Sequence, residues 1–190
     1  MDYVYLDTEF NRKDFSSKGL VSIALVAGND VYYAVNGEMD LQKIVGDPEI
    51  GAWMTENIFE PHILTHSMRR LRQTPDVKDY DVISAEVNAF LKAACPTGSA
   101  KDDIEIIVNC GAQDMVRLHT LLADNDFGRL GPWVPYGSDD MYRIKRKAYR
   151  LGLRKEELPV QRPETAHHAL YDAEYEREVH QFIRDRYGKI

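Results

Sequence analysis

The chain has 190 residues, of which 44% are hydrophobic and 29% charged, a composition that is typical of a globular protein and excludes an intrinsically disordered one. No apolar run approaches the ~20 residues needed to cross a membrane, and the opening sequence MDYVYLD does not resemble a signal peptide, so we expect one cytoplasmic domain over residues 1–190. The net charge of −7 argues against a general nucleic-acid coat protein, because binding along a phosphate backbone favours a basic surface.

Three short β-rich segments open the chain. Residues 3–10, 20–27 and 31–35 are rich in β-branched and aromatic residues, a pattern typical of strands. Gly-Asn-Asp at 28–30 supplies turn residues between the second and third segments. The sequence therefore predicts an antiparallel meander at the start of a sheet.

Helical patterns dominate the rest of the chain, interrupted by one apolar strand. Residues 104–110 (IEIIVNC) form a short apolar run between turn residues, which favours a buried strand. The expected helices cover residues 50–57, 84–94, 113–123, 139–151 and 169–186, with Ser138 as the N-cap of the fourth. This succession of elements predicts an α/β fold with one mixed sheet flanked by helices.

Asp7 and Glu9 lie two positions apart on the first predicted strand. Side chains at this spacing point to the same side of a strand, so the two carboxylates would face one site. Like charges this close repel each other unless a cation neutralises them, and hard oxygen ligands favour magnesium or manganese over zinc. The alternative is a solvated acidic pair at a strand end without a function.

Asp114 follows the apolar strand in the stretch NCGAQD, at a transition from strand to helix. Ligands of α/β proteins collect at the carboxyl ends of such strands. The alternative is an ordinary acid in the first turn of a helix, where the helix dipole favours negative charge.

The stretch HHALYD at 167–172 offers two pairings with Asp172. His168 lies four residues before it and would share a helix face with it, as a plain surface pair. His167 lies five residues before it and would converge with it only if the helix begins after His167. Pro163 upstream is consistent with such a late helix start.

The order of these three motifs is more specific than any one of them. An Asp-x-Glu strand (DTEF), an aspartate after a buried strand (GAQD) and a His-x4-Asp stretch (HHALYDA) occur together along this chain. The combination resembles the DEDDh 3′–5′ exonucleases of the ribonuclease H-like superfamily, the group of ribonuclease T and oligoribonuclease. It looks most similar to a small mycobacterial-type exoribonuclease branch. The resemblance covers nearly the whole chain in element order, and one departure is Gln113, where the family often has an aromatic residue.

This resemblance implies a fold, a chemistry and a set of partners. The fold would be a ribonuclease H-like mixed sheet, antiparallel for its first three strands and parallel thereafter. Two Mg²⁺ or Mn²⁺ ions would be held by four acids, with His167 as the general base. The implied metal ligands are Asp7, Glu9, Asp114 and Asp172. The implied activity is a 3′–5′ exoribonuclease that releases nucleoside 5′-monophosphates from single-stranded RNA 3′ ends. An exodeoxyribonuclease of the same family is the alternative, and the resemblance also implies a homodimer.

Substrate contacts are expected at three further residues. Phe10 follows the first motif and could stack on the terminal base, although phenylalanine is more often a core residue. Ser22 on the second strand could approach the terminal sugar, and Asn109 matches a common position of the family. Basic clusters at 69–72 and 143–150 could contact phosphates or simply be solvated.

Two other functions stay open at this stage. The chain could be a non-catalytic nucleic-acid or protein-binding module that has kept the fold. It could also be another metal-dependent phosphohydrolase that acts on small nucleotides. Four converging acids argue against the first, because they would cost stability without a metal.

Overall fold

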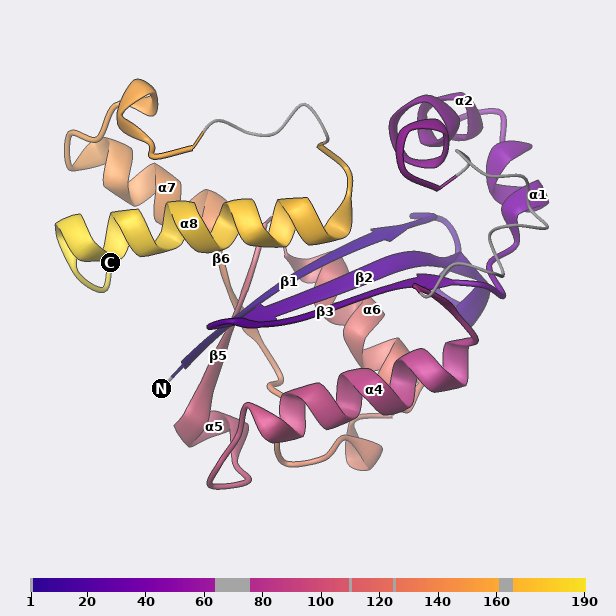
Figure 1. The fold of residues 1–190 in the computed structure, drawn as a ribbon, viewed down its shortest axis with the longest axis horizontal. Coiled ribbons are helices and arrows are strands. Elements are labelled where there is room, and N and C mark those ends of the chain that lie inside the picture. The colour runs from indigo at the N-terminus through magenta and orange to yellow at the C-terminus, as the bar shows by residue number, and fades with distance from the viewer. Residues whose placement is uncertain (1, 64–75, 110, 125, 161–165) are drawn as a thin grey trace.

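A six-stranded sheet forms the middle layer of the molecule, with helices on both of its faces (Figure 1). The computed structural model describes residues 2–63, 76–109, 111–124, 126–160 and 166–190. The strand order is β4-β3-β2-β1-β5-β6. The predicted α/β class with one mixed sheet is confirmed, while the basic cluster at 69–72 lies outside the described residues.

The first three strands form the predicted antiparallel meander. Their bounds are β1 (Asp2–Phe10), β2 (Leu20–Ala27) and β3 (Asp30–Asn36). The register between β1 and β2 shifts between Glu9 and Phe10, at the end of β1 that carries the acidic motif. The turn into β3 contains Gly28, whose φ of +57° lies in the left-handed region that glycine adopts without steric cost.

The remaining strands all run parallel to a neighbour. β5 (Ile104–Val108) is parallel to β1, β6 (Ser138–Asp140) is parallel to β5, and β4 (Val77–Lys78) is parallel to β3. The carboxyl ends of β1, β5 and β6 therefore meet at one edge of the sheet. This is the edge at which α/β folds place their ligands.

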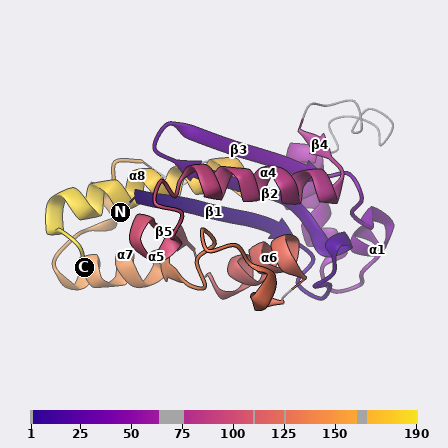
Figure 2. The ribbon, with the colours of Figure 1, turned by 90° about the horizontal axis from the view of Figure 1, so that it is seen from below.

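One face of the sheet is covered by helices from the middle of the chain (Figure 2). They are α4 (Tyr80–Ala93), the short α5 (Ala100–Asp103) and α6 (Ala112–Ala123). Their apolar residues bury the alternate strand positions that include Leu6 and Ile23. This core holds the start of α6 against the carboxyl end of β5.

The opposite face is covered by α7 (Met141–Arg150) and α8 (Ala169–Tyr187). Tyr5 and Val26 point to this face because they alternate with the residues of the first core. Asp7 and Glu9 follow Tyr5 at every second position. The strand therefore directs both acids toward α8.

A third apolar cluster lies at the end of the sheet, near the helices that follow β3. They are α1 (Leu41–Val45), α2 (Gly51–Met54) and a π-helical segment, η2 (Thr55–Ile63). The helix expected over 50–57 is thus divided between α2 and η2. Three short 3-10 helices complete the described elements: η1 (Ser17–Gly19), η3 (Phe127–Arg129) and η4 (Lys155–Glu157).

The helix expected over 139–151 begins two residues later than predicted, and its N-cap is Asp140 rather than Ser138. The Asp140 carboxylate accepts a hydrogen bond from the Tyr142 backbone N–H at 2.7 Å. Ser138 instead belongs to β6, because residues 138–140 pair with β5. Among the described residues, no helix is long and apolar enough to span a membrane.

Candidate active site

Asp7 and Glu9 lie at the carboxyl end of β1, on the side of the sheet that α8 covers. Thr8, between them, points to the opposite side. Its backbone N–H and its hydroxyl both donate to Oδ1 of Asp114, at 3.1 and 2.6 Å. The same strand end therefore carries two acids and anchors a third.

Asp114 lies in the first turn of α6, and a tight turn after β5 brings it there. Gly111 in this turn is buried, and a Cβ atom added to it would lie 1.7 Å from Cγ2 of Val108. Only a residue without a side chain allows β5 and α6 to approach this closely. The glycine therefore sets the position of Asp114 relative to the strand.

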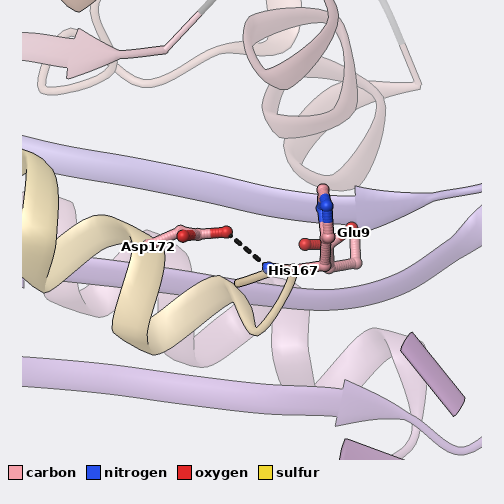
Figure 3. Close-up of side chains that lie close together, drawn as sticks. All are labelled: Glu9, His167 and Asp172. Atoms are coloured by element: carbon pink, nitrogen blue, oxygen red, sulfur yellow. Dashed lines mark hydrogen bonds between the residues drawn. The ribbon is translucent and has the colours of Figure 1, made fainter. Parts of the chain in front are cut away.

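His167 and Asp172 converge because α8 begins at Ala169, after both histidines. His167 has a φ of +71°, uncommon for a residue with a side chain. Its backbone N–H donates to Oδ2 of Asp172 at 2.8 Å, which closes the turn into the helix (Figure 3). The helix thus begins after His167, as the predicted pairing of His167 with Asp172 requires.

His168 takes a different environment. Its ring stacks on Tyr33 and Tyr171, with centroid distances of 4.7 and 4.3 Å, and meets the ring of His62 edge-on. Burial is the main reason that the pKa of His168 is below its ordinary value. It does not line the cleft described below, and it packs as an aromatic residue at the start of α8.

Glu9, His167 and Asp172 can offer one ligand atom each, all within 4.8 Å of one another (Figure 3). Asp7 is half-buried on the same strand as Glu9, and its pKa is raised well above 3.8 by desolvation and by the charges of Asp114, Glu9, Asp172 and Glu176. Desolvation likewise raises the pKa of Asp114 to about 6, against the hydrogen bonds from Thr8 that lower it. A divalent cation would relieve this repulsion, and carboxylate oxygens suit Mg²⁺ and Mn²⁺. The residues present therefore fit a metal site.

A cleft of about 630 Å³ opens over these acids. It is lined by all five residues of the predicted centre: Asp7, Glu9, Asp114, His167 and Asp172. Phe10 and Asn109, two of the expected substrate contacts, also line it, as does Gln113.

Ser22 is placed differently from the other expected substrate contacts. It pairs with Glu9 across the sheet and so lies on the same face, but it is only 2% exposed. It interacts with the hydroxyl group of Tyr33 and is not among the described residues that line the cleft. Its side chain is therefore covered rather than presented to the cleft.

The structure adds cleft residues that sequence reasoning missed. Arg12, Glu49 and Trp53 line the same space, and the Trp53 ring meets the His167 ring edge-on with a centroid distance of 4.8 Å. Glu176 is a buried acid one turn beyond Asp172, in an ion pair with Lys145 at 3.2 Å. The four-residue spacing of Asp172 and Glu176 was the one signal in the sequence that could have indicated this second acid.

Comparisons with solved structures agree with this geometry, whereas no protein-family model and no curated protein sequence matches the chain. A zinc-bound complex of E. coli exonuclease I with single-stranded DNA aligns over 99% of this chain and 41% of its own, at 11% identity and a TM-score of 0.62. Pop2p of S. pombe, in a Mg²⁺- and Mn²⁺-bound form, aligns over 99% of this chain and 85% of its own, at 16% identity and a TM-score of 0.59. The chain shares the fold of these proteins. It spans about two fifths of the length of exonuclease I.

The likeness confirms the predicted ribonuclease H-like sheet, antiparallel from β3 to β1 and parallel from β1 through β5 to β6. At these identities it is a likeness of fold alone. The activity of this chain must therefore be argued from its own cleft.

Proposed function

We propose that this chain is a metal-dependent 3′–5′ exonuclease that releases nucleoside 5′-monophosphates from single-stranded 3′ ends. The observation that carries the proposal is the convergence of acids from β1, α6 and α8, with His167, on one open cleft. The same fold occurs in the metal-bound Pop2p and in the DNA-bound exonuclease I.

Asp7, Glu9, Asp114 and Asp172 would hold two Mg²⁺ or Mn²⁺ ions. Such ions supply charge neutralisation at the phosphate and a more acidic bound water. Asp7 and Asp114, whose pKa values are raised, are suited to this role, because binding of a cation stabilises their ionised form. Thr8 would keep Asp114 oriented, since two hydrogen bonds fix one of its oxygens.

His167 would act as the general base that accepts the proton of the attacking water. Its backbone bond to Asp172 fixes the residue at the edge of the acidic cluster. Its ring contact with Trp53 restrains the direction of the imidazole. A positioned general base contributes about 10²–10⁴-fold to a rate.

Phe10 and Trp53 would hold the terminal base, and Asn109 would bind the strand near the scissile phosphate. Aromatic rings stack on bases of any sequence, which suits an enzyme that removes successive nucleotides. We propose RNA as the substrate from the resemblance to the mycobacterial-type exoribonucleases, with single-stranded DNA as the alternative.

Incubation of 3′- and 5′-labelled RNA and DNA oligomers with Mn²⁺ tests this function. We expect 5′-labelled RNA to shorten one nucleotide at a time, 3′-labelled RNA to release labelled mononucleotide at once, and a chelator to stop both reactions. Asp7→Asn is the matched control, since it keeps the size of the side chain and removes its charge. Binding without Mn²⁺-dependent cleavage would instead support a binding module, and cleavage of free nucleotides alone would support a phosphohydrolase.

A further inference from the structure

Four exposed cations lie on the outer side of α7. Arg143, Arg146, Lys147 and Arg150 follow one another at helical spacing and line a hollow of about 460 Å³ beside β6. On the inner side of the same helix, Met141, Ile144 and Ala148 pack toward α8. Over the roughly 15 Å length of a ten-residue helix, this basic surface of α7 presents about as many charges as a stacked single strand has phosphates.

These cations lack the acidic partners that other basic residues of the chain have. Lys13, Lys43, Lys78, Arg186 and Lys189 each form an ion pair with a carboxylate. Within the described residues, none of the four cations of the α7 surface lies within ion-pair distance of an acid. The cluster is therefore not neutralised locally, although the chain as a whole has a net charge of −7.

Two carboxylates do line the hollow, and both are otherwise engaged. Asp140 caps the helix through its bond to the Tyr142 backbone N–H. Asp139 forms a side-chain hydrogen bond with Glu105, and its electrostatic interaction with Lys147 is a smaller effect. Four cations and two acidic side chains line the hollow, so its charge stays positive.

Exposed aromatic rings adjoin the cations. Tyr142 and Tyr149 are 56% and 40% exposed, and their spacing of seven places them on one side of α7, next to the basic residues. Cations that neutralise phosphates and rings that stack on bases are the two components of surfaces that bind single strands without sequence preference.

The start of α7 lies beside the strand end that leads into the catalytic cleft. Asn109 lines the cleft and directly follows Val108, which pairs with Asp140 at the start of α7. On the inner side of α7, Lys145 pairs with Glu176, whose charge acts on Asp7. Strand pairing therefore brings the start of α7 near the cleft, on the side toward which a bound nucleic-acid strand could extend.

We propose that the outer side of α7 binds the body of a single-stranded nucleic acid, upstream of the 3′ end held in the cleft. This inference rests on the proposed nuclease function for its biological role, but binding to α7 does not require catalysis. It assigns two tasks to different parts of the molecule: the acidic cleft receives one chain end, and the basic helix retains the remainder of the strand.

The test compares two variants with the same change in charge. The first replaces the four cations of the α7 surface by glutamine: Arg143→Gln, Arg146→Gln, Lys147→Gln and Arg150→Gln. The control neutralises four exposed cations elsewhere that are outside any ion pair in the described chain: Lys18→Gln, Lys101→Gln, Arg129→Gln and Lys155→Gln. Fluorescence anisotropy with a single-stranded RNA of about 20 nucleotides, labelled at its 5′ end and kept intact by a chelator, measures binding at several salt concentrations.

We expect the α7 variant to bind at least tenfold more weakly than the control at low salt. The slope of log K against log salt should fall by about 2 to 3, since each phosphate contact on a single strand contributes about 0.7. Tyr142→Ser with Tyr149→Ser should weaken binding about fivefold or more without changing this slope, because stacking is not ionic. Melting temperatures equal to that of the parent would show that these exposed changes leave the fold intact.

Equal affinity and equal slope in the α7 variant and the control would overturn the proposal. Competition by polyglutamate as effective as that by unlabelled RNA would overturn the assignment to nucleic acid. Cleavage separates the two hypotheses: the α7 variant should lose at least tenfold in kcat/KM on the long strand and keep its rate on a dinucleotide. If the parent binds but never cleaves, the nuclease function fails while the α7 site stands.

Discussion

Arg117 is a buried cation that holds the segment after β1 against α6. It is 2% exposed, its guanidinium donates to the backbone oxygens of Asn11, at 2.8 Å, and of Asp14, and it lies between the rings of Phe10 and Phe15. Desolvation lowers the pKa of Arg117 from its ordinary value. Because Phe10 is both a wall of the cleft and a stacking partner of this cation, Arg117 positions part of the candidate substrate site.

Replacement of Arg117 by methionine should lower the free energy of unfolding by about 2–4 kcal/mol, because one buried and one part-buried carbonyl group lose charged donors. Arg117→Lys should recover little of this loss, since an ammonium group cannot present a planar fork between two rings. Urea unfolding at constant m-value measures the change. Lys92→Met is the control: Lys92 lies over the Trp133 ring but is exposed, so its loss should cost less than about 1 kcal/mol. Equal losses for Arg117→Met and Lys92→Met would contradict this role of Arg117.

At the scale of elements, the start of α8 decides which histidine reaches the cleft. The helix begins one residue after His168, so His168 packs among aromatic rings while His167 turns toward the acids. This arrangement places the His167 backbone in the left-handed region. For a residue with a side chain, this conformation typically costs about 1 kcal/mol or more of conformational free energy.

His167→Ala should lower kcat by about 10²–10⁴-fold and leave a measurable trace of activity. His168→Ala should instead lower the free energy of unfolding by about 1–2 kcal/mol, through lost ring packing, with a much smaller effect on kcat. Both are measured by single-turnover cleavage and thermal unfolding. His167→Gly is a matched control, because it should be as inactive as His167→Ala but more stable by about 1 kcal/mol at this φ. A His168→Ala variant as inactive as His167→Ala would contradict the assignment of His167 as the general base.

The elements that the sequence could predict are the long and periodic ones. The β-rich runs at β1 to β3 and the helices α6 and α8 lie within one residue of their expected bounds at each end. Two short strands, β4 and β6, were missed, because two or three residues show no periodicity and pair only through the sheet.

The same limit applies to the site. Residues within the three motifs could be named because the order of the motifs resembles a known family, whereas spacing alone left His167 and His168 as alternative partners of Asp172. Trp53 and Arg117 could not, because they reach their positions through tertiary packing of α2 and α6. Ser22 illustrates the converse: its strand was predicted correctly, but its burial depends on neighbouring residues that the local pattern does not describe.

At the scale of the whole molecule, the clustered acids of the cleft link the stability of the fold to pH and to the proposed metal ions. An acid whose pKa is higher when folded than when unfolded binds more protons in the folded state, so the free energy of unfolding falls as pH rises between the two values. For Asp114 this window runs from about 4 to about 6 and corresponds to the order of 3 kcal/mol, and Asp7 acts in the same direction.

Mn²⁺ should therefore raise the melting temperature more at pH 7.5 than at pH 5, because the cation stabilises the ionised acids that destabilise the metal-free protein. The difference between loaded and metal-free protein at each pH cancels other titrating groups, such as His180, whose pKa is lowered to about 4. Asp7→Asn should raise the metal-free melting temperature at pH 7.5 and reduce the response to Mn²⁺. A response of the same size at both pH values would contradict the coupling.

The acids of the cleft come from β1, α6 and α8, which lie far apart along the chain. A polypeptide ending before the HHALYD stretch would contain the whole sheet and most of the acids, yet it would lack both His167 and Asp172. During synthesis the proposed catalytic centre can form only after the final helix has docked. Assembly of this centre thus depends on completion of the tertiary structure, and partly folded forms should not cleave nucleic acid.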